Sequence, residues 1–270
     1  MARYLCVTCG TQYPESDAPP AHCPICEDER QYVNPAGQQW TTLDELQRDR
    51  RNVMTELEPR LTAVRTEPAF AIGQRAHLIE TPEGNILWDC ISFLDQATIQ
   101  AVQALGGIQA IAISHPHFYS AMVTWSRAFD DAPIYLHEDN APWVMHPDPA
   151  VQYWRGDTLK ANAQITLIRC GGHFDGSTAL HWSAGAEGHG ALFTADTLFV
   201  APDLRHVSFM YSFPNLLPLP PRRVRQVAAA VQPYHFERIY GGWEGRVIAS
   251  GGSDAVQRSA ERYLRLIAEG

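Results

Sequence analysis

The sequence lacks the features of a membrane or exported protein. No apolar run approaches the roughly 18 residues that a membrane-spanning helix needs, so we expect no membrane partner. The first segment, Met1–Cys6, has no signal-peptide pattern, because cysteines interrupt any apolar stretch there. We therefore expect a cytoplasmic protein.

Positive charge is also in short supply. The chain carries 21 lysines and arginines against 30 aspartates and glutamates, for a net charge of −9. Non-specific nucleic-acid binding depends on neutralising phosphates with positive charge, so we expect no nucleic-acid partner. Internal repeats and low-complexity tracts are absent as well. At 270 residues, the chain is long enough for one large domain with a small appendage.

The cysteines are few but clustered. Four of the six lie within the first 26 residues, as two C-x2-C pairs formed by Cys6, Cys9, Cys23 and Cys26. This spacing brings four thiolates to the corners of a tetrahedron and is typical of a structural zinc site. Two disulfides are the alternative, which a cytoplasmic location disfavours. We predict a zinc ribbon over residues 1–34, with rubredoxin-like iron as the competing metal. Four thiolates leave no open position, so this site is not expected to be catalytic.

The segment 35–66 has a different pattern. The stretch Thr42–Glu45 is a capping-box sequence, which typically opens a helix. Apolar residues follow at helix-compatible positions, namely Leu43, Leu46, Val53 and Leu57. We therefore predict a connecting helix and linker over 35–66.

From residue 67 onward, strand and helix patterns are mixed. Strands are predicted at 69–72, 75–80, 85–89, 108–113, 133–137, 165–169, 178–182, 191–195 and 238–240. Helices are predicted at 98–105, 121–129, 222–231 and 253–268. This mixture predicts an α/β domain over 67–270, with sheets covered by helices.

Polar residues stand where several of these strands end. His115 and His117 follow one apolar strand, His173 follows a second and Asp196 follows a third. Side chains at strand ends in separate parts of the chain can converge on one metal ion. Imidazole and carboxylate together suit zinc or iron, so we expect one Zn or Fe ion here.

These residues carry a resemblance to a known family. Residues 67–270 resemble the metallo-β-lactamase fold hydrolases, in which a strand-end Asp, a His-x-His motif, a Gly-His turn and a later Asp occur in this order. The matching positions are Asp89, His115-Pro-His117, Gly172-His173 and Asp196. The resemblance implies an αββα sandwich with metal at one edge and hydrolysis by metal-activated water. The family also contains oxidoreductases, nucleases and dioxygenases, so the fold is implied more firmly than the substrate.

The departures from the family pattern concern one of its two metal sites. Tyr119 and Ser120 replace an Asp and a His after the His-x-His motif, and Trp243 stands where the last Gly-His is expected. These three positions supply the private ligands of the family's second site. The resemblance therefore implies a single metal, bound by the two motif histidines and His173, with Asp196 as a fourth or labile ligand.

Other residues receive roles around this metal. Asp196 and Tyr119 are the catalytic candidates, although Tyr119 could equally pack over the metal. Asp89 is expected to orient a metal-binding loop by hydrogen bonds. Aromatic residues in the loop 203–214 predict a lid over the site. The candidate pocket residues are His206, Tyr211 and Trp243.

The sequence thus predicts a metal-dependent hydrolase with a mononuclear site. The expected partner is a small-molecule ester, amide, thioester or phosphoester, and the oligomeric state is not defined. Two alternatives remain open. One is a redox protein with iron in the four-cysteine site, and the other is a non-catalytic metal-binding member of the fold.

Overall fold

The computed structural model describes residues 1–268 and divides them between two compact units. One unit comprises Met1–Leu136 with Ala141–Tyr153, and the other comprises His137–Asn140 with the chain from Trp154 onward. The last two residues of the predicted 67–270 domain lie outside the described part. Within residues 1–268, no helix is long and apolar enough to cross a membrane.

The first unit begins with a small antiparallel sheet in the order β2-β1-β3. Its elements are β1 (Ala2–Cys6), β2 (Gln12–Ser16), β3 (Trp40–Thr41) and the short helix α1 (Pro24–Glu27). The four cysteines are buried between these elements together with Tyr13 and Ile25. Strand β3 pairs with β1 although it lies beyond residue 34. The ribbon sheet therefore uses residues that the sequence pattern assigned to the linker.

The predicted connecting helix over 35–66 is wrong beyond its first turn. Helix α2 (Leu43–Leu46) does begin with a capping box at Thr42, but it ends after four residues. The chain then forms the antiparallel strands β4 (Arg51–Glu58) and β5 (Leu61–Glu67). Alternating β-branched residues favour these strands, and Arg60, with a φ of 71°, makes the turn between them.

These two strands are the edge of a seven-stranded sheet in the order β10-β9-β8-β7-β6-β5-β4. Its other strands are β6 (Arg75–Ile79), β7 (Ile86–Trp88), β8 (Ala110–Ala112), β9 (Ile134–His137) and β10 (Val151–Trp154). The helices that follow β7 and β8 are α3 (Gln96–Ala104) and α4 (Met122–Ala128). Strands β7, β8 and β9 are parallel, so the loops after β7 and β8 leave the same edge of the sheet. The predicted strand at 69–72 is absent, because Ala71 adopts a φ of 52° and the chain turns there.

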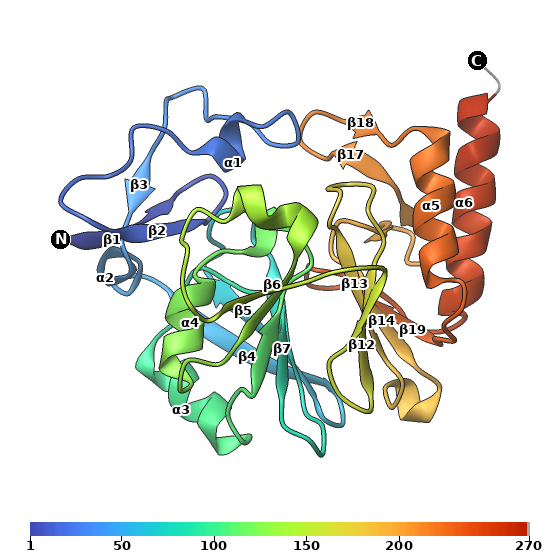
Figure 1. Ribbon diagram of the computed structural model, residues 1–270, viewed down its shortest axis with the longest axis horizontal. Helices are drawn as coiled ribbons and strands as arrows, with labels where there is room; N and C mark the ends of the chain where they lie inside the picture. The colour runs from blue at the N-terminus through green and yellow to red at the C-terminus, as the bar shows by residue number, and fades with distance from the viewer. Residues whose placement is uncertain (269–270) are drawn as a thin grey trace. The chain divides into compact units, whose positions relative to one another are not determined.

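The second unit contains a six-stranded sheet in the order β11-β12-β13-β14-β19-β20. Its strands are β11 (Thr158–Lys160), β12 (Ile165–Arg169), β13 (Thr178–Trp182), β14 (Ala191–Phe193), β19 (Arg238–Tyr240) and β20 (Val247–Ile248). Helices α5 (Pro221–Val231) and α6 (Gly252–Ala268) lie side by side (Figure 1) and enclose a core with this sheet. Because β12 and β14 are both antiparallel to β13 and β19 is parallel to β14, the loops after β12, β14 and β19 leave one edge.

Two short hairpins connect β14 to α5. Their strands are β15 (Phe199–Val200), β16 (Val207–Ser208), β17 (Met210–Ser212) and β18 (Leu217–Pro218). The segment that the sequence predicted as a lid, 203–214, therefore runs from the turn between β15 and β16 into the tip of the second hairpin. Its first aromatic residue, Phe209, is fully buried in the core of the second unit.

Candidate metal centres

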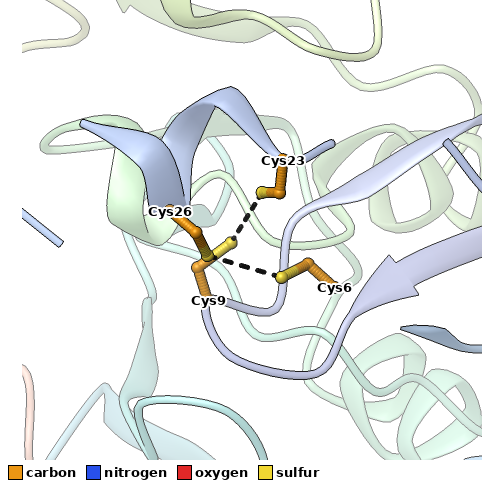
Figure 2. A group of neighbouring side chains, drawn as sticks. All are labelled: Cys6, Cys9, Cys23 and Cys26. Atoms are coloured by element: carbon orange, nitrogen blue, oxygen red, sulfur yellow. Dashed lines mark hydrogen bonds between the residues drawn. The ribbon is translucent and has the colours of Figure 1, made fainter. Parts of the chain in front are cut away.

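The four cysteines of the ribbon form a cluster whose sulfur atoms point toward one another (Figure 2). All four Sγ atoms lie within 4.8 Å of one another. The Cys6–Cys26 and Cys9–Cys23 Sγ separations are 3.5 Å and 3.6 Å. Two thiolates on a tetrahedral zinc, each with a Zn–S bond of about 2.3 Å, stand about 3.8 Å apart. The cluster thus fits a zinc-ribbon-like metal site.

The thiols of the cluster shift one another's pKa values in opposite directions. Hydrogen bonds from the thiols of Cys23 and Cys26 lower the pKa of Cys6. Burial raises the pKa of Cys9, because a second thiolate cannot be solvated there. Around the sulfurs, Gln38 Nε2 donates to Cys6 Sγ at 3.2 Å. A bound metal would supply the positive charge that lets all four thiols deprotonate together.

The first unit holds two of the predicted histidine ligands. His115 and His117 flank Pro116 in the turn after β8, and both side chains are buried. Their ring centroids lie 5.2 Å apart with the planes near perpendicular. His115 Nδ1 is 2.9 Å from the hydroxyl of Ser114, so its Nε2 is the nitrogen left for a metal.

Asp89 holds the loop that carries these histidines. Its Oδ1 accepts a hydrogen bond of 2.8 Å from the backbone N–H of Ser114, the residue that contacts His115. Asp89 is 1% exposed and adopts a φ of 60°, a conformation that Asp and Asn tolerate better than most residues. A chain of hydrogen bonds therefore runs from Asp89 through Ser114 to the His115 ring.

Tyr119 and Ser120, at the positions where the resemblance implies an Asp and a His, are both buried. Ser120 Oγ accepts a hydrogen bond of 2.8 Å from Gln74 Nε2. The backbone carbonyl of Ser120 accepts a second hydrogen bond, 2.9 Å long, from the N–H of Gln12 in β2. Ser120 is thus engaged with protein groups on both its side chain and its backbone.

The second unit holds the other two predicted ligands. His173 Nε2 lies 3.7 Å from Asp196 Oδ2, and both side chains are buried. This separation is too long for a hydrogen bond, but two ligands each about 2.1 Å from one tetrahedral ion stand about 3.4 Å apart. His173 Nδ1 lies 3.2 Å from the carbonyl oxygen of Met210 and can donate to it, which leaves Nε2 as the metal-ligating nitrogen.

The turn that carries His173 depends on two glycines. Gly171 and Gly172 have φ values of 66° and 87°. A Cβ on Gly172 would lie 2.8 Å from Val227 Cγ2, and one on Gly171 would lie 2.5 Å from Gln226 Nε2. Both neighbours belong to α5, so the close approach of this helix fixes the turn.

A row of aromatic rings in the second unit begins beside His173. Phe213 lies 6.0 Å from the His173 ring and 4.7 Å from Phe199, whose ring is 5.3 Å from Trp243. Arg246 lies 5.8 Å above the Phe199 ring. All four of these side chains are partly exposed. Trp243, which follows β19, is therefore part of an aromatic wall.

The other two predicted pocket residues have different surroundings. Tyr211 packs against the buried core cluster of the second unit. His206 Nδ1 bonds Asp203 Oδ2 at 2.7 Å in a turn. Hydrogen bonds from the backbone N–H of Arg205 and from the His206 side chain lower the pKa of Asp203 to about 2. Phe199, Ser114 and the Met210 carbonyl were not singled out from the sequence; Phe199 and Ser114 act through side chains, whereas Met210 acts through its backbone.

Together, the two units present metal-ligating residues of two kinds. One set is the four-cysteine cluster, and the other is a group of three imidazoles and a carboxylate: His115, His117, His173 and Asp196. The second donor set is one that zinc and iron both accept.

Comparison with known proteins places these residues in a family context. Residues 71–230 match the family model of the metallo-beta-lactamase superfamily. An uncharacterized protein of Bacillus subtilis strain 168, YmaE, is 49% identical over 269 residues, covering 99% of this chain and 97% of that protein.

Solved structures show the same fold at low identity. A B3 metallo-beta-lactamase with an active-site glutamic acid aligns with a TM-score of 0.53 and 18% identity, over 85% of this chain and 94% of that one. The crystal structure of VMB-1 aligns with a TM-score of 0.60 and 11% identity, over 82% of this chain and 99% of that one. The predicted αββα fold class with an N-terminal zinc-ribbon-like segment is confirmed. The chain belongs to the metallo-β-lactamase superfamily.

Proposed function

We propose that the protein is a metal-dependent hydrolase that uses a single metal-activated water on a small-molecule ester, amide, thioester or phosphoester. What carries the proposal is the donor set of His115, His117, His173 and Asp196 in a chain of this superfamily. In this proposal, the two buried ligand pairs, one from each unit, share one ion. That ion is Zn or Fe, and the ribbon holds a structural Zn.

The bound metal would lower the pKa of a water molecule toward neutrality and polarise the oxygen of the bond to be cleaved. The protein prepares the ligands for this chemistry. Contacts at the Nδ1 atoms of His115 and His173 leave their Nε2 atoms for the metal. The Asp196 carboxylate offsets part of the metal charge and is the fourth or labile ligand. In the proposal, the buried phenol of Tyr119 hydrogen-bonds the substrate or covers the metal.

Three contacts support one metal in this centre. The hydroxyl of Ser120 is engaged by Gln74, and its carbonyl by the ribbon. Trp243 offers an indole ring to Phe199 where the family motif has a metal-binding imidazole. Tyr119, Ser120 and Trp243 supply no carboxylate or imidazole for a second ion. Without such ligands, a second ion would also be repelled by the first at the roughly 3.5–4 Å spacing of two-metal sites.

The same proposal extends to cellular context. We place the protein in the cytoplasm, where its six cysteines, none of which forms a disulfide, would remain reduced. Its partner would be a small molecule, not a nucleic acid or a membrane. Phe199, Phe213 and Trp243 would then line the side of the pocket that receives the apolar part of the substrate.

The test is hydrolysis of a panel of chromogenic esters, thioesters, phosphodiesters and a β-lactam by the full-length protein. We expect at least one substrate to be cleaved, with loss after chelation and recovery after zinc or iron is returned. His117→Ala should abolish the activity, whereas His189→Ala, at an exposed position, should not. Hydrolysis that survived chelation or His117→Ala would contradict the proposal. A coloured ferric four-thiolate site without hydrolysis would favour the redox alternative.

A further inference from the structure

The ribbon contacts the loops that follow β7 and β8. Gly10, directly after Cys9, accepts a hydrogen bond of 2.8 Å at its carbonyl from Ser92 Oγ. Gln12, two residues further on, donates its backbone N–H to the Ser120 carbonyl at 2.9 Å. Ser92 lies three residues after Asp89, and Ser120 lies three residues after His117.

These contacts are buried and specific. Gln12, Ser92 and Ser120 are between 1% and 4% exposed. The Gln12 side chain is fixed as well, because Thr124 Oγ1 donates to its Oε1 at 2.7 Å. A Cβ on Gly10 would lie 2.3 Å from Ser92 Oγ, so a side chain at this position would displace the Ser92 hydroxyl. The ribbon surface and the loops therefore fit closely at this point.

Ser120 connects the ribbon to the loop that follows β8. Its φ of 45° is unfavourable for a residue other than glycine, so surrounding contacts must hold it. Those contacts are the Gln12 N–H from the ribbon and the Gln74 amide, which also donates to the Cys90 carbonyl. At the position where the family motif has a metal-binding histidine, this chain has Ser120, whose carbonyl binds the ribbon.

We propose that Gly10 and Gln12 are positioning residues, through which the four-cysteine metal sets the affinity of the histidine centre for its own metal. The inference rests on the proposed function, because it assumes that His115 and His117 bind metal. The ribbon metal fixes Cys9, and Cys9 fixes the Gly10–Gln12 segment. Loss of the ribbon metal releases that segment, and the Asp89 and His117 loops lose their support.

The experiment compares two glycines of the ribbon region in the full-length protein. Gly10 and Gly37 have φ values of +82° and +92°, so an alanine at either position meets the same kind of backbone strain. Only Gly10 faces the loops, whereas a Cβ on Gly37 has nothing within 4 Å. Zinc affinity of the histidine centre is measured by competition with a chromophoric chelator. Cobalt–thiolate absorption reports separately on the ribbon.

Gly10→Ala should weaken the histidine centre by about tenfold or more while cobalt still fills the ribbon, as is usual when the support of a metal ligand is lost. Gly37→Ala should leave that affinity within about twofold. Cys23→Ser, which opens the ribbon site, should weaken the histidine centre as Gly10→Ala does.

Equal zinc affinities of the histidine centre in the Gly10→Ala and Gly37→Ala proteins would overturn the inference. An unchanged zinc affinity of that centre in Cys23→Ser would overturn it as well. A different result marks failure of the proposed function. If His117→Ala bound as much metal as the wild type, no histidine centre would exist, and the inference would be overturned with it.

Discussion

Replacing Asp89 tests whether a buried carboxylate prepares the histidine ligands. In Asp89→Ala, the buried N–H of Ser114 loses its 2.8 Å acceptor, which costs about 1–3 kcal/mol. The φ of 60° adds about 1–2 kcal/mol for a residue that disfavours this region. The sum, about 2–5 kcal/mol, is a large part of the roughly 5–15 kcal/mol that stabilises a typical protein.

Asp89→Asn separates stability from metal binding. Asparagine tolerates the positive φ and keeps one oxygen to accept from Ser114, so most of the stability should remain. The charge is lost, however, and the support of the Ser114–His115 pair weakens. We expect the zinc affinity of the histidine centre to fall about 10–100-fold.

The assay combines urea unfolding with zinc competition at pH 7.5, on the wild type and both variants. We expect Asp89→Ala to lower both the free energy of unfolding and the zinc affinity. Asp89→Asn should lower mainly the zinc affinity. Wild-type zinc affinity in Asp89→Asn would refute the role of the carboxylate. An Asp89→Ala protein as stable as the wild type would refute the energetic argument.

Three further changes test other parts of the structure. Gly172→Ala should destabilise the protein by about 1–3 kcal/mol in urea unfolding, because its Cβ would lie 2.8 Å from Val227; unchanged stability would contradict this packing. Burial lowers the pKa of His77 well below its ordinary value near 6.5, so the folded state keeps this residue neutral while the unfolded chain takes up a proton. The free energy of unfolding should therefore decrease as pH falls from 6.5, and His77 contributes at most about 1.4 kcal/mol per pH unit to this decrease. His77→Phe should show a flatter pH dependence of stability. Parallel stability curves for the wild type and His77→Phe would argue against this role of His77. Phe213→Ala should raise KM roughly tenfold for substrates with an apolar group, equivalent to about 1.4 kcal/mol, with little change in kcat; an unchanged KM would remove Phe213 from the pocket.

Much of the fold could be predicted from sequence periodicity. The strands at 165–169, 178–182 and 238–240 agree with β12, β13 and β19, and the three longest helices agree within about two residues at each end. The failure at β4 and β5 has a physical cause. A capping box marks where a helix begins but not its length, and the apolar residues Val53 and Leu57 after it also fit strand β4, which pairs with β5.

The candidate site was predictable where its residues carry chemistry in their side chains. The cysteine pairs and the strand-end histidines indicate metal binding by residue type and spacing. The groups that position these residues give no such indication in the sequence. The Met210 carbonyl beside His173 and the Gln12 N–H beside Ser120 are backbone atoms, which every residue possesses. Their roles arise from tertiary packing, so no sequence pattern could indicate them.

The metal content of the full-length protein, measured by element at saturating zinc or iron, tests the central claim most directly. The account predicts two ions per chain: one in the four-cysteine site and one shared by His115, His117, His173 and Asp196. Cys23→Ser and His117→Ala should each retain one ion, and the ions that they lose should be different. Three ions in the wild type, or two in His117→Ala, would contradict a single metal centre built on these residues.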